Sequence, residues 1–91
     1  MDLSNKRVKR NEAVAWRVIE AESLLVDPKT ALIYPLNEVA SQIWELLDGE
    51  TTCTEIVGII DREFEGDKKA VTADVTGFIE ELLSRNLAYL V

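Results

Sequence analysis

The chain has 91 residues, 47% of them hydrophobic, and a net charge of −7, which suits one domain with a modest core and excludes a second domain. No apolar run approaches the ~20 residues that cross a bilayer and the N-terminus has no apolar signal segment, so we expect a cytoplasmic protein without a membrane partner. Histidine is absent and Cys53 is the single cysteine, which argues against disulfides, imidazole catalysis and a metal site.

Charge is distributed unevenly along the chain. Residues 1–17 contain five basic and two acidic residues, a net charge of +3, whereas residues 18–91 contain five and fifteen, a net charge of −10. A domain this acidic repels the phosphate backbone of nucleic acids, so we expect no nucleic-acid partner. Residues 1–13 include the basic stretch 6–10 and lack apolar periodicity. The sequence therefore predicts a flexible basic N-terminal arm over residues 1–13, followed by a single domain over residues 14–91.

Three short strands are predicted first. Trp16 and Arg17 fall on opposite faces of an alternating run over residues 14–19, and a second apolar run covers residues 23–26. A tight turn at Asp27–Pro28–Lys29 leads to a third run over residues 31–34, which Pro35 ends. Strands joined this closely favour an antiparallel meander, covered by helices on one face and with an open edge.

Three helices follow, and local motifs predict where each begins and ends. The predicted N-caps are Asn37, Thr52 and Asp67, and the left-handed closing residues are Gly49 and Asn86. Thr52 and Glu55 have the spacing of a capping box. Gly58 lowers the stability of the second helix, so we expect another backbone to pack closely there.

The predicted fold class is α+β, with a three-stranded antiparallel sheet followed by three helices in a winged helix-turn-helix-like arrangement. A DNA-binding member of that class presents basic or amide side chains from its third helix to the groove. Here the outward positions include Asp74, Glu80 and Glu81, which carry the wrong charge to face phosphates.

From residue 14 to the C-terminus the sequence resembles the PqqD family, which binds ribosomally made precursor peptides. The resemblance depends on the order and spacing of several short motifs. These are Leu24-Leu25-Val26-Asp27-Pro28, Tyr34-Pro35-Leu36-Asn37, Ile43-Trp44-Glu45-Leu46-Leu47-Asp48-Gly49, Thr52-x-x-Glu55-Ile56-Val57, Asp74-Val75 and Phe78-Ile79-x-x-Leu82-Leu83. Asn86 stands where the family often has glycine, a change that alters little because asparagine also tolerates the left-handed conformation.

The resemblance implies a non-catalytic peptide chaperone without a cofactor. It would bind the leader of a precursor peptide and present it to a modifying enzyme, commonly a radical S-adenosylmethionine (SAM) enzyme, as in pyrroloquinoline quinone (PQQ) biosynthesis. The leader would add as a strand along the third strand, in the groove beside the third helix. By that resemblance the peptide-binding residues are Leu32, Ile33 and Tyr34 on the strand and Val75, Phe78, Ile79 and Leu82 on the helix, with about two of the four helix residues at the groove and the others in the core.

Two other functions are compatible with parts of the sequence. The first alternative is a winged-helix transcription regulator that binds DNA. A small enzyme or quinone carrier ranks last, because the sequence has no histidine, metal-ligand cluster or glycine-rich phosphate loop that would gather the carboxylates into an active site. An open strand edge also predicts a homodimer, formed by edge pairing or strand exchange.

Overall fold

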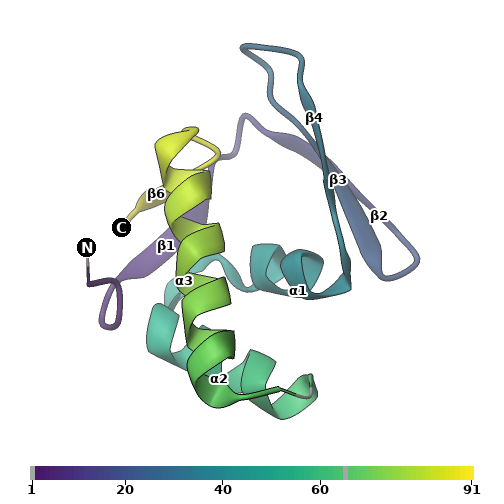
Figure 1. Cartoon of the computed structure of the whole chain (residues 1–91). Coiled ribbons are helices and arrows are strands. Elements are labelled where there is room, and N and C mark those ends of the chain that lie inside the picture. The colour runs from purple at the N-terminus through teal and green to yellow at the C-terminus, as the bar shows by residue number, and fades with distance from the viewer. Residues whose placement is uncertain (1, 65) are drawn as a thin grey trace.

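The computed structural model describes residues 2–64 and 66–91. The described residues form six strands and three helices, whose arrangement is shown in Figure 1. In chain order they are β1 (Arg7–Arg10), β2 (Ala15–Ile19), β3 (Glu22–Val26), β4 (Ile33–Leu36), α1 (Glu38–Leu46), β5 (Asp48–Thr52), α2 (Cys53–Glu63), α3 (Lys68–Ser84) and β6 (Ala88–Leu90).

The strands form two antiparallel sheets. One sheet has the order β2-β3-β4 and the other the order β5-β1-β6. The helices lie on one side of the β2-β3-β4 sheet (Figure 1). The α+β class and the series of three antiparallel strands followed by three helices are therefore confirmed, and α2 and α3 pack together as the predicted helix pair. The second sheet was not predicted.

Strand β1 corrects the expectation of a flexible arm over residues 1–13. It is the central strand of its sheet, between β5 and β6. Val8 and Leu3 are buried in the core, and Cys53 N–H donates to the Lys6 carbonyl (3.0 Å). A strand with one solvated face needs only every second residue to be apolar. Val8 meets this need while basic residues flank it, so the stretch resembles a solvated tail in sequence.

The third predicted strand is displaced by two residues. Ala31 adopts φ +60° in the turn before β4, and its N–H donates to the Asp27 carbonyl (2.8 Å). The strand itself begins at Ile33 and includes Pro35, which we had expected to end it. Proline is tolerated here because β4 lies at the edge of the sheet.

The predicted helix caps are confirmed at most positions. The side chains of Asn37, Thr52 and Asp67 cap α1, α2 and α3, and Thr52 forms the capping box with Glu55. Asn86 has φ +58° after α3. Two expectations were wrong. Gly49 (φ +82°) does not close α1, which ends at Leu46, but lies within β5. No backbone of the described residues packs closely at Gly58, because a Cβ added there would meet nothing within 4 Å.

A tryptophan of α1 connects the two sheets. Trp44 is fully buried in the core, and its ring meets that of Trp16 in β2 edge to face, with centroids 6.1 Å apart. The Arg10 guanidinium lies 5.4 Å from the Trp16 ring centroid and donates to the carbonyls of Trp44 (3.0 Å) and Glu45 (2.8 Å). Arg10 thus satisfies carbonyls at the C-terminal end of α1, which has no basic residue in its last turn.

Candidate functional site

Strand β4 has one edge that no other strand of the described chain occupies. Asp27 N–H donates to the Leu32 carbonyl (3.0 Å), which fixes the phase of the β3–β4 ladder. Antiparallel residue pairs alternate between hydrogen-bonded and non-hydrogen-bonded positions. Tyr34, two residues beyond Leu32, therefore directs its backbone toward β3. Ile33 and Pro35 direct theirs toward the free edge.

The free edge offers a short and asymmetric set of backbone groups. Ile33 presents both an N–H and a carbonyl, whereas Pro35 presents a carbonyl alone. Because the Pro35 nitrogen faces away from β3, the proline costs the native sheet no hydrogen bond. An extended polypeptide laid along β4 would find one donor and two acceptors here.

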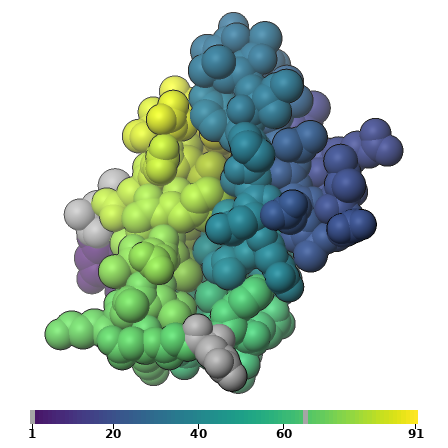
Figure 2. All heavy atoms as spheres, turned by 45° about the vertical axis from the view of Figure 1, so that its right-hand side comes forward, coloured from purple at the N-terminus to yellow at the C-terminus, as the bar shows by residue number. Residues whose placement is uncertain are grey.

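A cavity of about 200 Å³ separates β4 from α3. The surfaces of the two elements meet along one face of the molecule (Figure 2). The cavity is mostly apolar, with one acid and one base. Its lining residues are Leu25, Tyr34, Pro35, Leu36, Phe78, Glu81, Leu82, Arg85 and Leu87. An apolar hollow beside a free strand edge has the two features that a strand-adding peptide requires.

Arg85 lies on the polar side of this cavity and contacts both Tyr34 and Glu81. Its guanidinium lies 5.4 Å from the Tyr34 ring centroid, and its Nε donates to Glu81 Oε1 (3.2 Å), one helical turn earlier. The hydrogen bond to Glu81 is the main cause that raises the pKa of Arg85. An arginine guanidinium is charged at neutral pH in any case, and this one lies against the ring of Tyr34.

The seven residues expected to bind peptide are not equally placed. Leu32 and Ile33 are 53% and 61% exposed beside the free edge. Tyr34, Phe78 and Leu82 meet at the cavity. Val75 and Ile79 are 1% and 0% exposed and belong to the core instead.

Other lining residues were missed by sequence reasoning. Arg85 and Glu81 have the i, i+4 spacing of a helical ion pair, and both lie within two turns of Phe78. That spacing was readable in the sequence, but only the structure places the pair against Tyr34. Pro35 was interpreted as the end of the strand and not as part of the edge.

Metal-ligating side chains do not cluster in the described part of the chain. No group of three or more metal-ligating side chains is found within residues 2–64 and 66–91. Burial raises the pKa of the Cys53 thiol, which favours its neutral, unreactive form. Among the described residues, no helix is both long and apolar enough to span a bilayer.

Comparison with known proteins identifies a family and several solved structures that this chain resembles. The family model described as "Coenzyme PQQ synthesis protein D (PqqD)" matches residues 22–88. The structure of TbiB1 in complex with the TbiA(beta) leader peptide is 31% identical in sequence, with a TM-score of 0.78, and the match covers 88% of this chain and 93% of TbiB1. No curated protein matches the sequence.

Two further solved structures share the fold. Lasso peptide synthetase B1, complexed with its leader peptide, is 14% identical with a TM-score of 0.79, over 91% of this chain and 98% of that one. The heterocyclase TruD is 17% identical with a TM-score of 0.66, and the match covers 94% of this chain but only 12% of TruD. Since the family model covers most of the sequence and TbiB1 is similar over nearly its whole length, this chain belongs to the PqqD family.

Proposed function

We propose that this protein binds the leader segment of a ribosomally made precursor peptide as an additional strand along β4. Membership of the PqqD family supports this function, as does the similarity to TbiB1, whose structure contains a leader peptide. The observation that carries the proposal is the free edge of β4 beside an apolar cavity.

The register of β4 defines how the guest strand would be held. Its backbone would accept a hydrogen bond from Ile33 N–H and donate to the carbonyls of Ile33 and Pro35. Side chains alternate along a strand. Guest residues opposite Tyr34 would therefore point into the cavity, toward Phe78 and Leu82, while residues opposite Ile33 and Pro35 would lie on the far face of the sheet.

The proposed role is to hold a peptide without changing it chemically. The modification would be made by a separate enzyme, of the radical SAM class or another peptide-modifying class, to which the loaded protein presents its guest. Short extended segments bind with modest surface area and lose entropy on ordering. A peptide held only by β4 and its cavity can therefore be released once it has been modified.

DNA binding is the less favoured function. Asp74 and Glu81 are exposed on α3, the helix that would have to enter a groove, and the net charge of −7 opposes approach to phosphate. Tight, sequence-selective binding in a gel-shift assay at low salt would favour this alternative over the peptide chaperone.

The edge that would receive the guest is also open to a second copy of the chain. We propose that the peptide-free protein forms a homodimer at high concentration by edge pairing or strand exchange, because unpaired backbone groups seek partners. Light scattering over a concentration series tests this, and the leader peptide should shift the population toward the monomer. A purely monomeric peptide-free protein would contradict it.

Titration with leader peptides, recorded by NMR on the labelled protein, tests the main proposal. Candidate leaders should include the TbiA(beta) leader, the ligand of the similar TbiB1. Binding should shift the amide signals of Ile33, Tyr34, Leu36 and Phe78, with small changes in β5 and β6. A leader that binds but leaves β4 unaffected would contradict the proposed site.

A further inference from the structure

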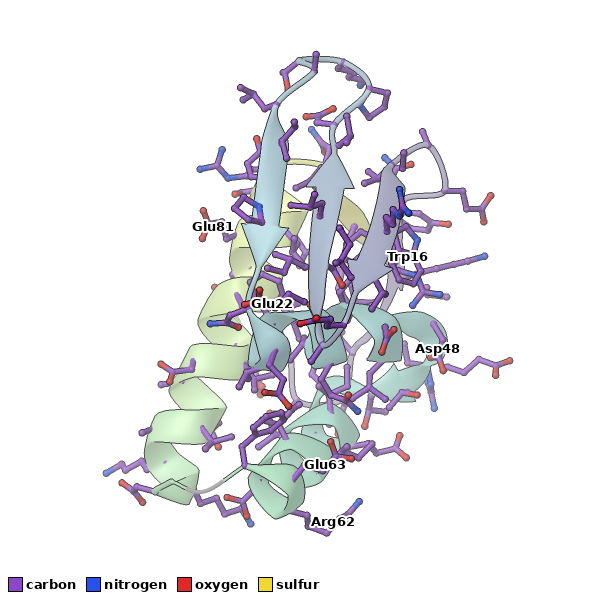
Figure 3. The ribbon with its side chains drawn as sticks, turned by 90° about the vertical axis from the view of Figure 1, so that its right-hand side faces the viewer. Trp16, Glu22, Asp48, Arg62, Glu63 and Glu81 are labelled. Atoms are coloured by element: carbon purple, nitrogen blue, oxygen red, sulfur yellow. The ribbon has the colours of Figure 1, made fainter. Side chains whose placement is uncertain are left out.

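The β2-β3-β4 sheet has a second face that its own helices do not cover. Figure 3 looks onto this outer face, with the helices behind the sheet. An antiparallel sheet that is covered on one side usually places polar residues on the other. Here most outward residues are apolar and exposed: Ile19, Leu24, Val26, Ile33 and Pro35. Exposed apolar surface of this kind marks an interaction site.

A hollow of about 450 Å³ opens at one end of the outer face. It lies where the β2–β3 turn approaches the junction of β4 and α1, close to Glu22 (Figure 3). Its apolar walls include Ile19, Leu24 and Pro35, and its acidic side is formed by Glu20 and Glu22. Its volume lies within the range of small-ligand clefts. It is also separate from the cavity between β4 and α3, since only Pro35 and Leu36 line both.

Neither carboxylate of the hollow forms an ion pair with a described residue, although Arg17 lies on the same face of the sheet, opposite Leu24 and diagonal to Glu22. The ion pairs found among residues 2–64 and 66–91 join Lys9 to Glu12 and Arg85 to Glu81. A ligand that complements the hollow therefore carries a positive charge at one end and hydrocarbon along its length. Arginine and lysine side chains have this construction, and the guanidinium of arginine can bridge carboxylate oxygens.

We propose that the hollow binds an arginine or lysine side chain of a different protein, which covers the outer face of the sheet. A second copy of this chain is a poorer occupant of this acidic hollow, because it has a net charge of −7 and complements two carboxylates less well than a basic partner does. The partner's contact surface would be apolar with a basic residue projecting from it. This inference does not depend on leader binding, since the guest strand would occupy the edge of β4 and not the hollow.

The side-chain preference can be measured with two small probes. Nα-acetyl-arginine amide is cationic, and Nα-acetyl-citrulline amide is its neutral counterpart of nearly the same shape. Each is titrated into the whole protein while the methyl signals of Ile19 and Leu24 are followed by NMR. Ligands of this size bind weakly, and we expect a dissociation constant of roughly millimolar order for the arginine probe. Citrulline amide should bind about threefold more weakly.

Two matched variants separate the hollow from the overall charge. Glu22→Gln removes a carboxylate of the hollow, and Glu63→Gln removes the same charge from α2, outside the hollow. The first should weaken the preference for arginine, because only Glu20 remains in the hollow, and the second should preserve it. Amide spectra that match the wild type establish that both variants are folded.

Three results would overturn the proposal. The arginine and citrulline probes could bind equally well, or the Ile19 and Leu24 methyl signals could fail to move at tens of millimolar probe. Glu63→Gln could also weaken arginine binding as much as Glu22→Gln does. Separately, methyl shifts at the same residues on concentrating the protein alone would assign the face to a second copy, and so contradict a different protein as the occupant.

Discussion

Replacing Ile33 with proline tests the proposed register of β4. The Ile33 N–H faces the free edge, so the native sheet does not use it, whereas a guest strand would accept its hydrogen bond. Ile33→Pro should therefore leave the free energy of unfolding nearly unchanged and weaken leader binding. Proline at an edge position with its nitrogen toward solvent is tolerated.

The expected loss follows from leaving one guest carbonyl without its donor. An unsatisfied buried acceptor costs about 1–3 kcal/mol, which corresponds to a roughly 5- to 150-fold higher dissociation constant. Ile33→Ala is the matched control, because it also removes the exposed side chain but keeps the N–H. Tyr34→Pro is the opposite control, since the Tyr34 backbone faces β3 and its loss should destabilise the fold.

Isothermal titration with a leader peptide and urea unfolding measure the two effects separately. The expected order of leader affinity is wild type, then Ile33→Ala, then Ile33→Pro, with all three unfolding at similar urea concentrations. If Ile33→Pro binds the leader as tightly as Ile33→Ala does, the Ile33 N–H is not part of the peptide ladder and the proposed register is wrong.

Four further predictions concern the stability of the fold. Gly58→Ala should stabilise the protein by about 1 kcal/mol in urea unfolding, because α2 gains a better helix former and the added methyl meets nothing within 4 Å; a destabilised variant would show that the site is in fact tightly packed. Thr52→Ala should lower the free energy of unfolding, measured in the same way, by about 1 kcal/mol, because α2 loses its N-terminal cap. The backbone hydrogen bond from Thr52 lowers the pKa of Glu55 below its ordinary 4.5. The ionised Glu55 carboxylate therefore stabilises the fold above that pH, and this stabilisation is lost as the pH falls through the folded-state pKa. The urea midpoints of Glu55→Gln and wild type should converge in acid, and a difference that stays constant with pH would contradict this. Val8→Ala should cost about 2 kcal/mol because β1 is part of the core, whereas Lys6→Ala at the exposed neighbouring position should change stability little; equal effects would contradict a buried β1.

The sequence predicted best what neighbouring residues determine. The caps at Asn37, Thr52 and Asp67 involve hydrogen bonds within a few residues, and each forms as expected. The β2-β3-β4 meander likewise joins segments separated only by short turns. Local motifs of this kind are visible in a single sequence because both partners lie in one short window.

The second sheet could not be predicted in the same way. Strand β5 has the sequence Asp-Gly-Glu-Thr-Thr and β1 is mostly basic, so neither has the apolar alternation of a typical strand. Their pairing depends on contacts between residues more than 40 positions apart, such as Arg7 with Thr52. Helical periodicity likewise could not separate Phe78 and Leu82, which line the cavity, from Val75 and Ile79, which do not. That division depends on where β4 meets α3.

Amide hydrogen exchange at Ile33 and Tyr34 tests the central claim most directly. In the peptide-free protein the Tyr34 amide, bonded to β3, should exchange slowly, and the Ile33 amide at the open edge should exchange quickly. A bound leader should strongly slow exchange at Ile33 and change Tyr34 little. Fast exchange at Ile33 in the saturated complex would contradict a guest strand on β4.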